Sequence, residues 1–140
     1  DRPGRVILQT RQPEHYALSC ATRQDLGQLL EEENSIRKLL RYPPHGHLAR
    51  ILCEDEEEQK AYESAKVLVE AMKECGLDSV QILGPAPAPI ERLRGRFRQH
   101  LLLKSLHRGP LREVASTALN TKPRWASTRI TLDIDPQNLL

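Results

Sequence analysis

After His47, strand and helix patterns follow one another in the order β-α-β-β-α-β, an order that few folds can accommodate. The strand patterns cover 48–53, 80–83, 96–106 and 128–135, and the helix patterns cover 55–76 and 110–119. Such an order gives a mostly antiparallel four-stranded sheet with both helices on one face, which leaves the other face open to a partner. We therefore predict an α+β fold for residues 45–140.

Several of these segments carry recognisable end signals. Asp55 and Glu58 fit a capping box at the start of the first helix, and Gly76 stands where a glycine ends a helix. Pro110 lies in the first turn of the second helix. In residues 128–135 the side chains alternate between two faces, as in a strand with one buried face: Thr128, Ile130, Leu132 and Ile134 on one, and Arg129, Thr131, Asp133 and Asp135 on the other. Between the second and third strands, a Gly-Pro-Ala-Pro-Ala-Pro sequence predicts a rigid loop.

The residues before His47 have a different pattern. Residues 5–10 form a short, nearly continuous apolar run, typical of a strand buried in a parallel sheet, yet no helix–strand repeats surround it. A helix is predicted from Asp25, with Gln28 as its third-position partner, and Pro43-Pro44 ends it. We therefore divide the chain into residues 1–44, a strand plus helices, and residues 45–140, a complete small domain.

The composition argues against several classes of protein. The chain is 39% apolar and 29% charged, which supports one modest core, and no apolar run is long enough to cross a bilayer. Its three cysteines are widely spaced, which argues against a disulfide framework and a structural zinc site and favours free thiols in a reducing cytosol. A nucleophile elbow and a phosphate-binding loop are both missing, so we expect no catalysis by this chain alone. Because the chain starts at Asp1, we interpret it as a fragment or processed product.

The acidic run 54–58 and the histidine pair His45 and His47 are the candidates for a metal site. Clustered carboxylates can hold a hard cation, but this run lies at a predicted helix start, where the helix dipole stabilises negative charge. Two imidazoles without a third ligand make a weak zinc site. We therefore predict structural roles for both and assign no metal ligand.

The chain is close to neutral, at a net charge of +2, but one stretch is strongly basic. The candidates for DNA contact are Arg92, Arg94, Arg96, Arg98 and Lys104. On a strand from Arg96, alternate positions place the cations on one face and Phe97, Leu101 and Leu103 in the core. A row of cations can follow a phosphate backbone, although an edge strand kept soluble by charge explains the same composition equally well.

The same residues carry a resemblance to a known family. The matching motifs, in chain order, are Gly4 to Thr10 with Pro13 and His15, Arg37 before Tyr42-Pro43-Pro44, Leu83 to Pro89, Arg92 to Arg98 with Leu101 to Lys104, and Asp133 to Pro136. In this order they resemble the C-terminal part of the bacterial primosomal replication-restart DNA helicases (PriA, primosomal protein N′). The motifs span nearly the whole chain, and the proline loop joined to the arginine turn is the most specific.

The resemblance implies a place for each part of the chain. Residues 1–44 would be the trailing edge of the second helicase lobe, and residues 45–140 a C-terminal domain, similar in fold to a small ribosomal-subunit protein, that helps bind branched or single-stranded DNA at abandoned forks. The parent would be an ATP-dependent 3′–5′ DNA helicase of the bacterial cytoplasm, associated with the nucleoid. ATP with magnesium, and zinc, would be bound upstream, and no cofactor by this chain.

The resemblance also implies protein partners. In the family, an arginine at the start of the last helix helps hold the acidic, Phe-ending tail of single-stranded-DNA-binding protein, and Arg108 matches it. The position one turn later, glutamine in relatives, is Arg112 here, and a guanidinium can pair with a terminal carboxylate. The helicase lobes of the parent chain would be a further partner, and no membrane is implied.

The sequence departs from the family pattern at two aromatic positions. Residues 97–100 read Phe-Arg-Gln-His where relatives commonly read Tyr-Arg-Trp-Gln, so Gln99 replaces an aromatic residue. His45 likewise stands where phenylalanine is usual. The cationic contribution is kept, but base stacking by this domain is not expected. Two alternatives stay open: a purely protein-interacting module that docks on the helicase lobes, or an RNA-binding domain of ribosomal type, suggested by fold order alone.

Overall fold

The computed structural model describes residues 4–76 and 78–137, and the chain divides into two compact units. The first unit ends at Ile36 and the second begins at Arg37. The boundary expected from the sequence lay a little later, after residue 44. The origin of the first unit in a helicase lobe stays a prediction.

The first unit contains α1 (Tyr16–Arg23) and most of α2 (Leu26–Leu40). The predicted start of α2 is confirmed, because Asp25 Oδ1 accepts a hydrogen bond of 2.9 Å from the Gln28 N–H. The predicted strand at 5–10 is wrong: these residues have no regular secondary structure, and Val6 is 84% exposed. A strand needs a neighbour to pair its backbone groups, and none of the described strands pairs with this segment.

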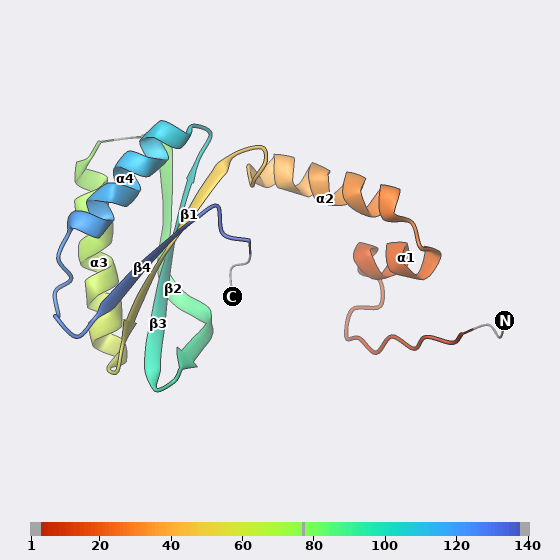
Figure 1. The fold of residues 1–140 in the computed structure, drawn as a ribbon, viewed down its shortest axis with the longest axis horizontal. Helices are drawn as coiled ribbons and strands as arrows, with labels where there is room; N and C mark the ends of the chain where they lie inside the picture. Colours follow the sequence, from red (N-terminus) through yellow and green to blue (C-terminus); the bar gives the residue numbers. More distant parts are fainter. Residues whose placement is uncertain (1–3, 77, 138–140) are drawn as a thin grey trace. The chain divides into compact units, whose positions relative to one another are not determined.

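The second unit is an open four-stranded sheet with two helices on one face (Figure 1). The strands are β1 (His47–Asp55), β2 (Val80–Leu93), β3 (Arg96–Ser105) and β4 (Arg129–Ile134), and the helices are α3 (Glu58–Glu74) and α4 (Arg108–Asn120). The strand order is β2-β3-β1-β4, and every pair is antiparallel. The α+β fold and its element order are therefore confirmed.

The core lies between the helices and one face of the sheet. Alternate residues of the two central strands point into it, including Ile51 and Cys53 of β1 and Leu101 and Leu103 of β3, all fully buried. Across from them pack the apolar faces of the helices, with Leu68 and Met72 from α3 and Leu111 and Val114 from α4. Burial raises the pKa of the Cys53 thiol to about 12, so this cysteine is an inert core side chain.

The proline-rich segment is a strand rather than the predicted loop. β2 continues from Val80 to Leu93, with register shifts between Leu83 and Ala86 and between Pro87 and Arg92. Because β2 is at the edge of the sheet, it tolerates prolines, and both register shifts fall within or beside the proline-rich segment. The sheet edge is thereby protected from pairing with another chain.

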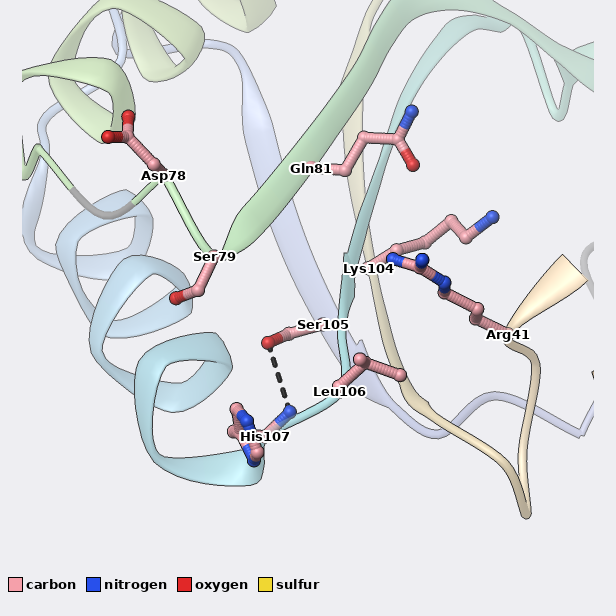
Figure 2. A pocket seen from close by; sticks show the side chains of 8 residues that line it. All are labelled: Arg41, Asp78, Ser79, Gln81, Lys104, Ser105, Leu106 and His107. Atoms are coloured by element: carbon pink, nitrogen blue, oxygen red, sulfur yellow. Dashed lines mark hydrogen bonds between the residues drawn. The ribbon is translucent and has the colours of Figure 1, made fainter.

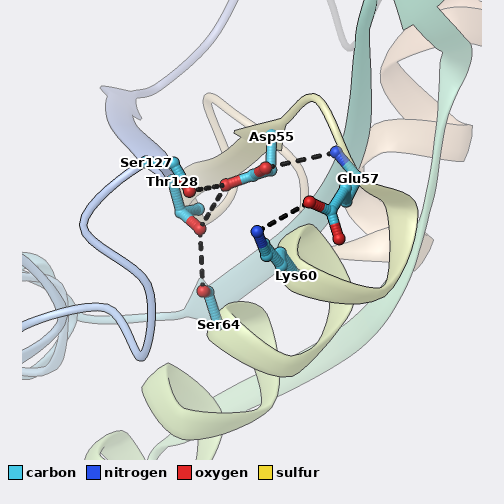
Figure 3. A network of polar contacts seen from close by, with 6 residues as sticks. All are labelled: Asp55, Glu57, Lys60, Ser64, Ser127 and Thr128. Atoms are coloured by element: carbon cyan, nitrogen blue, oxygen red, sulfur yellow. Dashed lines mark hydrogen bonds and ion pairs between the residues drawn. The ribbon is translucent and has the colours of Figure 1, made fainter.

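The acidic run at the start of α3 is built around one buried carboxylate (Figure 3). Asp55 is 1% exposed and accepts hydrogen bonds from Ser127 Oγ at 2.8 Å, Thr128 Oγ1 at 2.9 Å and the Glu57 N–H at 3.2 Å. The expected capping box is therefore wrong in detail, because Glu57 is the N-cap and Asp55 instead joins this turn to the approach to β4. Burial opposes the charge of Asp55, but the hydrogen bonds outweigh it and hold its pKa below the usual value.

Candidate nucleic-acid interface

The β2–β3 hairpin carries the first of the predicted DNA-contacting residues. Arg94 and Gly95 form its turn with φ angles of 51° and 83°, the two successive positive values that a tight hairpin turn requires. Arg92 pairs with Phe97 across the hairpin, and its guanidinium lies 4.8 Å from the centre of that ring. Both arginines are exposed, and neither has a carboxylate within ion-pair distance among residues 4–76 and 78–137.

The alternation predicted for β3 is confirmed for its leucines, but Phe97, which was expected in the core, is only half-buried and its ring lies against the Arg92 guanidinium. Leu101 and Leu103 are fully buried on the helix side, so Arg96, Arg98 and Lys104 lie on the face without helices. That face is less accessible than expected, since Leu48 and Leu52 of β1 are only 3% and 8% exposed there. Side chains of neighbouring strands cover one another on this face.

Arg96 and Arg98 are held by acidic residues of β1 and of the turn after it. Arg98 is 7% exposed, its Nε lies 3.4 Å from Glu54 Oε1, and it donates a hydrogen bond to the Ile90 carbonyl at 3.2 Å. Arg96 lies 3.6 Å from Glu56 Oε1 and also donates to two backbone carbonyls. Arg98 therefore links β3 to β1 and β2, and Arg96 is only partly available to a phosphate.

Glu54 is the residue that sequence reasoning missed. In the antiparallel register, Glu54 of β1 stands directly opposite Arg98 of β3, and opposite charges at such positions attract. The acidic run and the basic run, separated along the sequence, thus partly neutralise each other. Aligning the two strands in antiparallel order would have revealed the pair, but the register could not be read from either strand alone.

His100 lies on the same face as these ion pairs. Burial lowers its pKa, and the nearby Arg50 and Arg98 guanidinium groups lower it further. The imidazole is therefore neutral near pH 7 and adds no positive charge to the interface. Among the described residues, its Nδ1 is buried without a hydrogen-bond partner.

Lys104 is at the other end of β3, beside a pocket of about 460 Å³ (Figure 2). Its ammonium group lies 5.0 Å from the centre of the Tyr42 ring. The pocket is lined by Arg41, Asp78, Ser79, Gln81, Lys104, Ser105, Leu106 and His107. Lys104 is thus well separated along β3 from the arginines of the hairpin turn.

The two residues predicted to bind a partner protein lie on α4. Arg108 is 65% exposed and lies 3.8 Å from Asp135 Oδ2, while Arg112 is one turn further along and is also exposed. Their spacing places both guanidinium groups on one side of the helix. Among the described residues, no cluster of three potential metal ligands occurs, and no helix is both long and apolar enough to cross a membrane.

A family model and the curated relatives that match this chain point to the same protein family. The family model "Primosomal protein N C-terminal domain" matches residues 38–137. The chain is 29% identical over 144 residues to the replication restart protein PriA of Bacillus subtilis, covering 100% of this chain and 18% of that protein. It is 31% identical over 140 residues to PriA of Treponema pallidum, covering 98% of this chain and 21% of the relative. The chain thus spans about a fifth of the length of these relatives.

Proposed function

Since this chain belongs to the family of the primosomal protein N C-terminal domain, we propose that it is an accessory DNA-binding and partner-docking domain of a replication-restart helicase. In this proposal the domain binds branched or single-stranded DNA and has no catalytic activity of its own. The longer protein would be an ATP-dependent 3′–5′ helicase of the primosome, with its ATP, magnesium and zinc sites outside this chain.

The DNA-binding proposal is supported most directly by the hairpin turn. Arg92 and Arg94 project from the end of a protected edge strand, exposed and without carboxylate partners among the described residues. Arg98 is held by Glu54 and cannot reach a phosphate without leaving a half-buried carboxylate unpaired. Arg92 and Arg94 are therefore the main candidates for phosphate contacts, with Arg96 and Lys104 as secondary ones.

The test is the salt dependence of binding to a labelled fork. If Arg92 and Arg94 each neutralise one phosphate, the double variant Arg92→Gln/Arg94→Gln should reduce the slope of log affinity against log salt by about 2. The matched control is Lys66→Gln/Lys122→Gln, which removes the same charge from two exposed lysines elsewhere. Equal slopes for the two double variants would remove the hairpin turn from the interface.

The docking proposal is supported by the two exposed arginines on one side of α4. We expect an acidic peptide that ends in phenylalanine to bind there, as the tail of single-stranded-DNA-binding protein does in the family. Titration of the peptide should show weaker binding to Arg108→Ala than to Lys122→Ala. Identical binding curves for these two variants would remove Arg108 from the site.

A further inference from the structure

A second cationic site lies at the end of β3 remote from the hairpin. Arg41 and Lys104 are on one side of the pocket shown in Figure 2, and Asp78 and Ser79 are on the opposite side. Neither Arg41 nor Lys104 has an ion-pair partner in the part of the chain that the structure describes. The cationic end of the pocket is therefore able to receive an anion.

The backbone holds Arg41 beside β3. Arg41 follows the last residue of α2 with φ 55°, and its N–H bonds to the Lys38 carbonyl at 3.2 Å. Gly46 then passes so close that an added Cβ would clash with the Arg41 carbonyl oxygen and lie 3.3 Å from that of Ser105. The loop and the end of β3 are thus packed together, and the two cations belong to one ordered wall.

The start of α4 adds to the attraction for anions. His107 is the N-cap of this 13-residue helix and makes no side-chain hydrogen bond to its first turn. The first N–H groups of a helix carry partial positive charge and bind phosphate and carboxylate groups. His107 also lines the pocket, so this helix end adds to the field of Arg41 and Lys104.

The acidic end of the pocket narrows the choice of ligand. Asp78 lies at the end of the pocket opposite Arg41 and Lys104, so its charge disfavours a ligand that is negatively charged throughout, such as an acidic peptide, although its carboxylate points away from the other lining side chains in Figure 2. The Gln81 amide extends toward the Lys104 side of the pocket in Figure 2 and can both donate and accept hydrogen bonds. A nucleotide has this polarity, with a phosphate at one end and a base with N–H donors at the other.

We propose that this pocket binds one nucleotide of a DNA strand, with its phosphate against Arg41 and Lys104 and its base beside Gln81. The inference rests on the proposed DNA-binding function and adds a second contact to it. A volume of about 460 Å³ is within the range of pockets that take small organic ligands.

The test is a titration of the isotope-labelled chain with deoxyguanosine 5′-monophosphate, followed by amide chemical shifts. We expect shifts at Ser79, Gln81, Ser105 and His107, and at least tenfold weaker binding of deoxyguanosine, which lacks the phosphate. Equal binding of deoxyguanosine and its phosphate would overturn the proposal.

Matched variants separate the pocket from general charge effects. Lys104→Gln and Arg41→Gln should each weaken binding of the guanine nucleotide about fivefold, because each removes one charged contact. Lys122→Gln removes the same charge beyond the far end of α4 and should change nothing. Identical affinities for Lys104→Gln and Lys122→Gln would overturn the proposal, as would binding of an acidic peptide at these residues in place of the nucleotide.

Failure of the pocket proposal can be told apart from failure of the DNA-binding proposal, because the two are measured by different ligands. Arg92→Gln/Arg94→Gln should weaken fork binding and leave the nucleotide titration unchanged, since those residues are at the other end of β3. Fork binding that persists while the nucleotide causes no shifts would overturn the pocket alone. Loss of both in the wild-type chain would overturn both proposals.

Discussion

The hairpin turn and the middle of β3 carry the same residue type in opposite circumstances. Arg92 and Arg94 are exposed and have no carboxylate partner among the described residues, while Arg98 is 7% exposed and paired with Glu54. All three belong to one run of alternating arginines in the sequence. What separates them is the neighbouring strand, since Glu54 of β1 faces Arg98, whereas the last residue of β1, Asp55, directs its carboxylate to Ser127, Thr128 and the Glu57 N–H.

A local excess of positive charge in the sequence is thus not the same as accessible positive charge in the fold. The acidic run contains a similar division, because Asp55 is buried while Glu56 is 79% exposed. In both runs, the buried members join elements of the sheet and the exposed members remain available to solvent or a ligand. Substitutions on either side of this division should therefore affect different properties.

The largest effect is expected from Arg98→Ala. This change leaves Glu54 in a site where only 15% of its side chain is exposed, and an unpaired buried charge destabilises a fold by about 3 kcal/mol. Urea unfolding measures the loss. Arg94→Ala, in the same run, should change the free energy of unfolding by less than about 0.5 kcal/mol. Equal losses of unfolding free energy for the two variants would show that burial and pairing do not distinguish Arg98 from Arg94.

Asp55→Asn should lower the free energy of unfolding by a smaller amount, about 2 kcal/mol near pH 7, because the substitution weakens hydrogen bonds to a buried carboxylate. The pKa of Asp55 is lowered in the fold, so its charge stabilises the protein above its unfolded pKa, near 4, and this contribution disappears as pH falls through the folded pKa. The difference between wild type and variant should therefore narrow below about pH 4. Unfolding measured from pH 7 to pH 3 tests this.

The exposed Glu56 provides the control for Asp55. Glu56→Gln should leave the free energy of unfolding nearly unchanged at every pH in that range, because the side chain is largely solvated. A difference between wild type and Asp55→Asn that stays constant as the pH falls would show that the charge of Asp55 contributes nothing, and that only its shape and hydrogen bonds matter.

The smallest effect on stability is expected at the hairpin turn. Arg94 has a left-handed backbone with φ 51°, which glycine adopts without steric cost. Arg94→Gly should therefore leave the free energy of unfolding unchanged or raise it by up to about 1 kcal/mol, while reducing the salt slope of DNA binding by about 1. Arg94→Ala keeps the backbone strain and removes the same charge. If Arg94→Gly binds the fork as the wild type does, the turn is not a phosphate contact.

Much of the second unit could be predicted from the sequence because its signals are local. The helix pattern with Gly76 at its end, Pro110 in the first turn of α4, and the strict alternation of the last strand all lie in the elements where they were expected. Each of these signals depends on backbone geometry or periodicity within one element. Such signals do not depend on which element packs beside them.

The expectations that were wrong depended on neighbours. The apolar run 5–10 has the composition of a strand but no described strand to pair with. The prolines of 84–89 indicated a loop, yet on an edge strand they are tolerated because one side needs no N–H donors. In both cases, the presence or absence of a pairing strand decided the outcome.

The order of the elements, most of the core leucines and the family resemblance can be read from the sequence alone, because periodicity, end signals and motifs lie along the chain. Which charges are accessible depends on the tertiary structure. Antiparallel pairing of β1 with β3 places Glu54 opposite Arg98, while the turn carries Arg94 beyond the end of β1. The packing of Gly46 against Arg41 likewise creates a cationic pocket from residues far apart in sequence. Electrostatic attraction depends on distance in space, which the chain acquires only when its strands are in register.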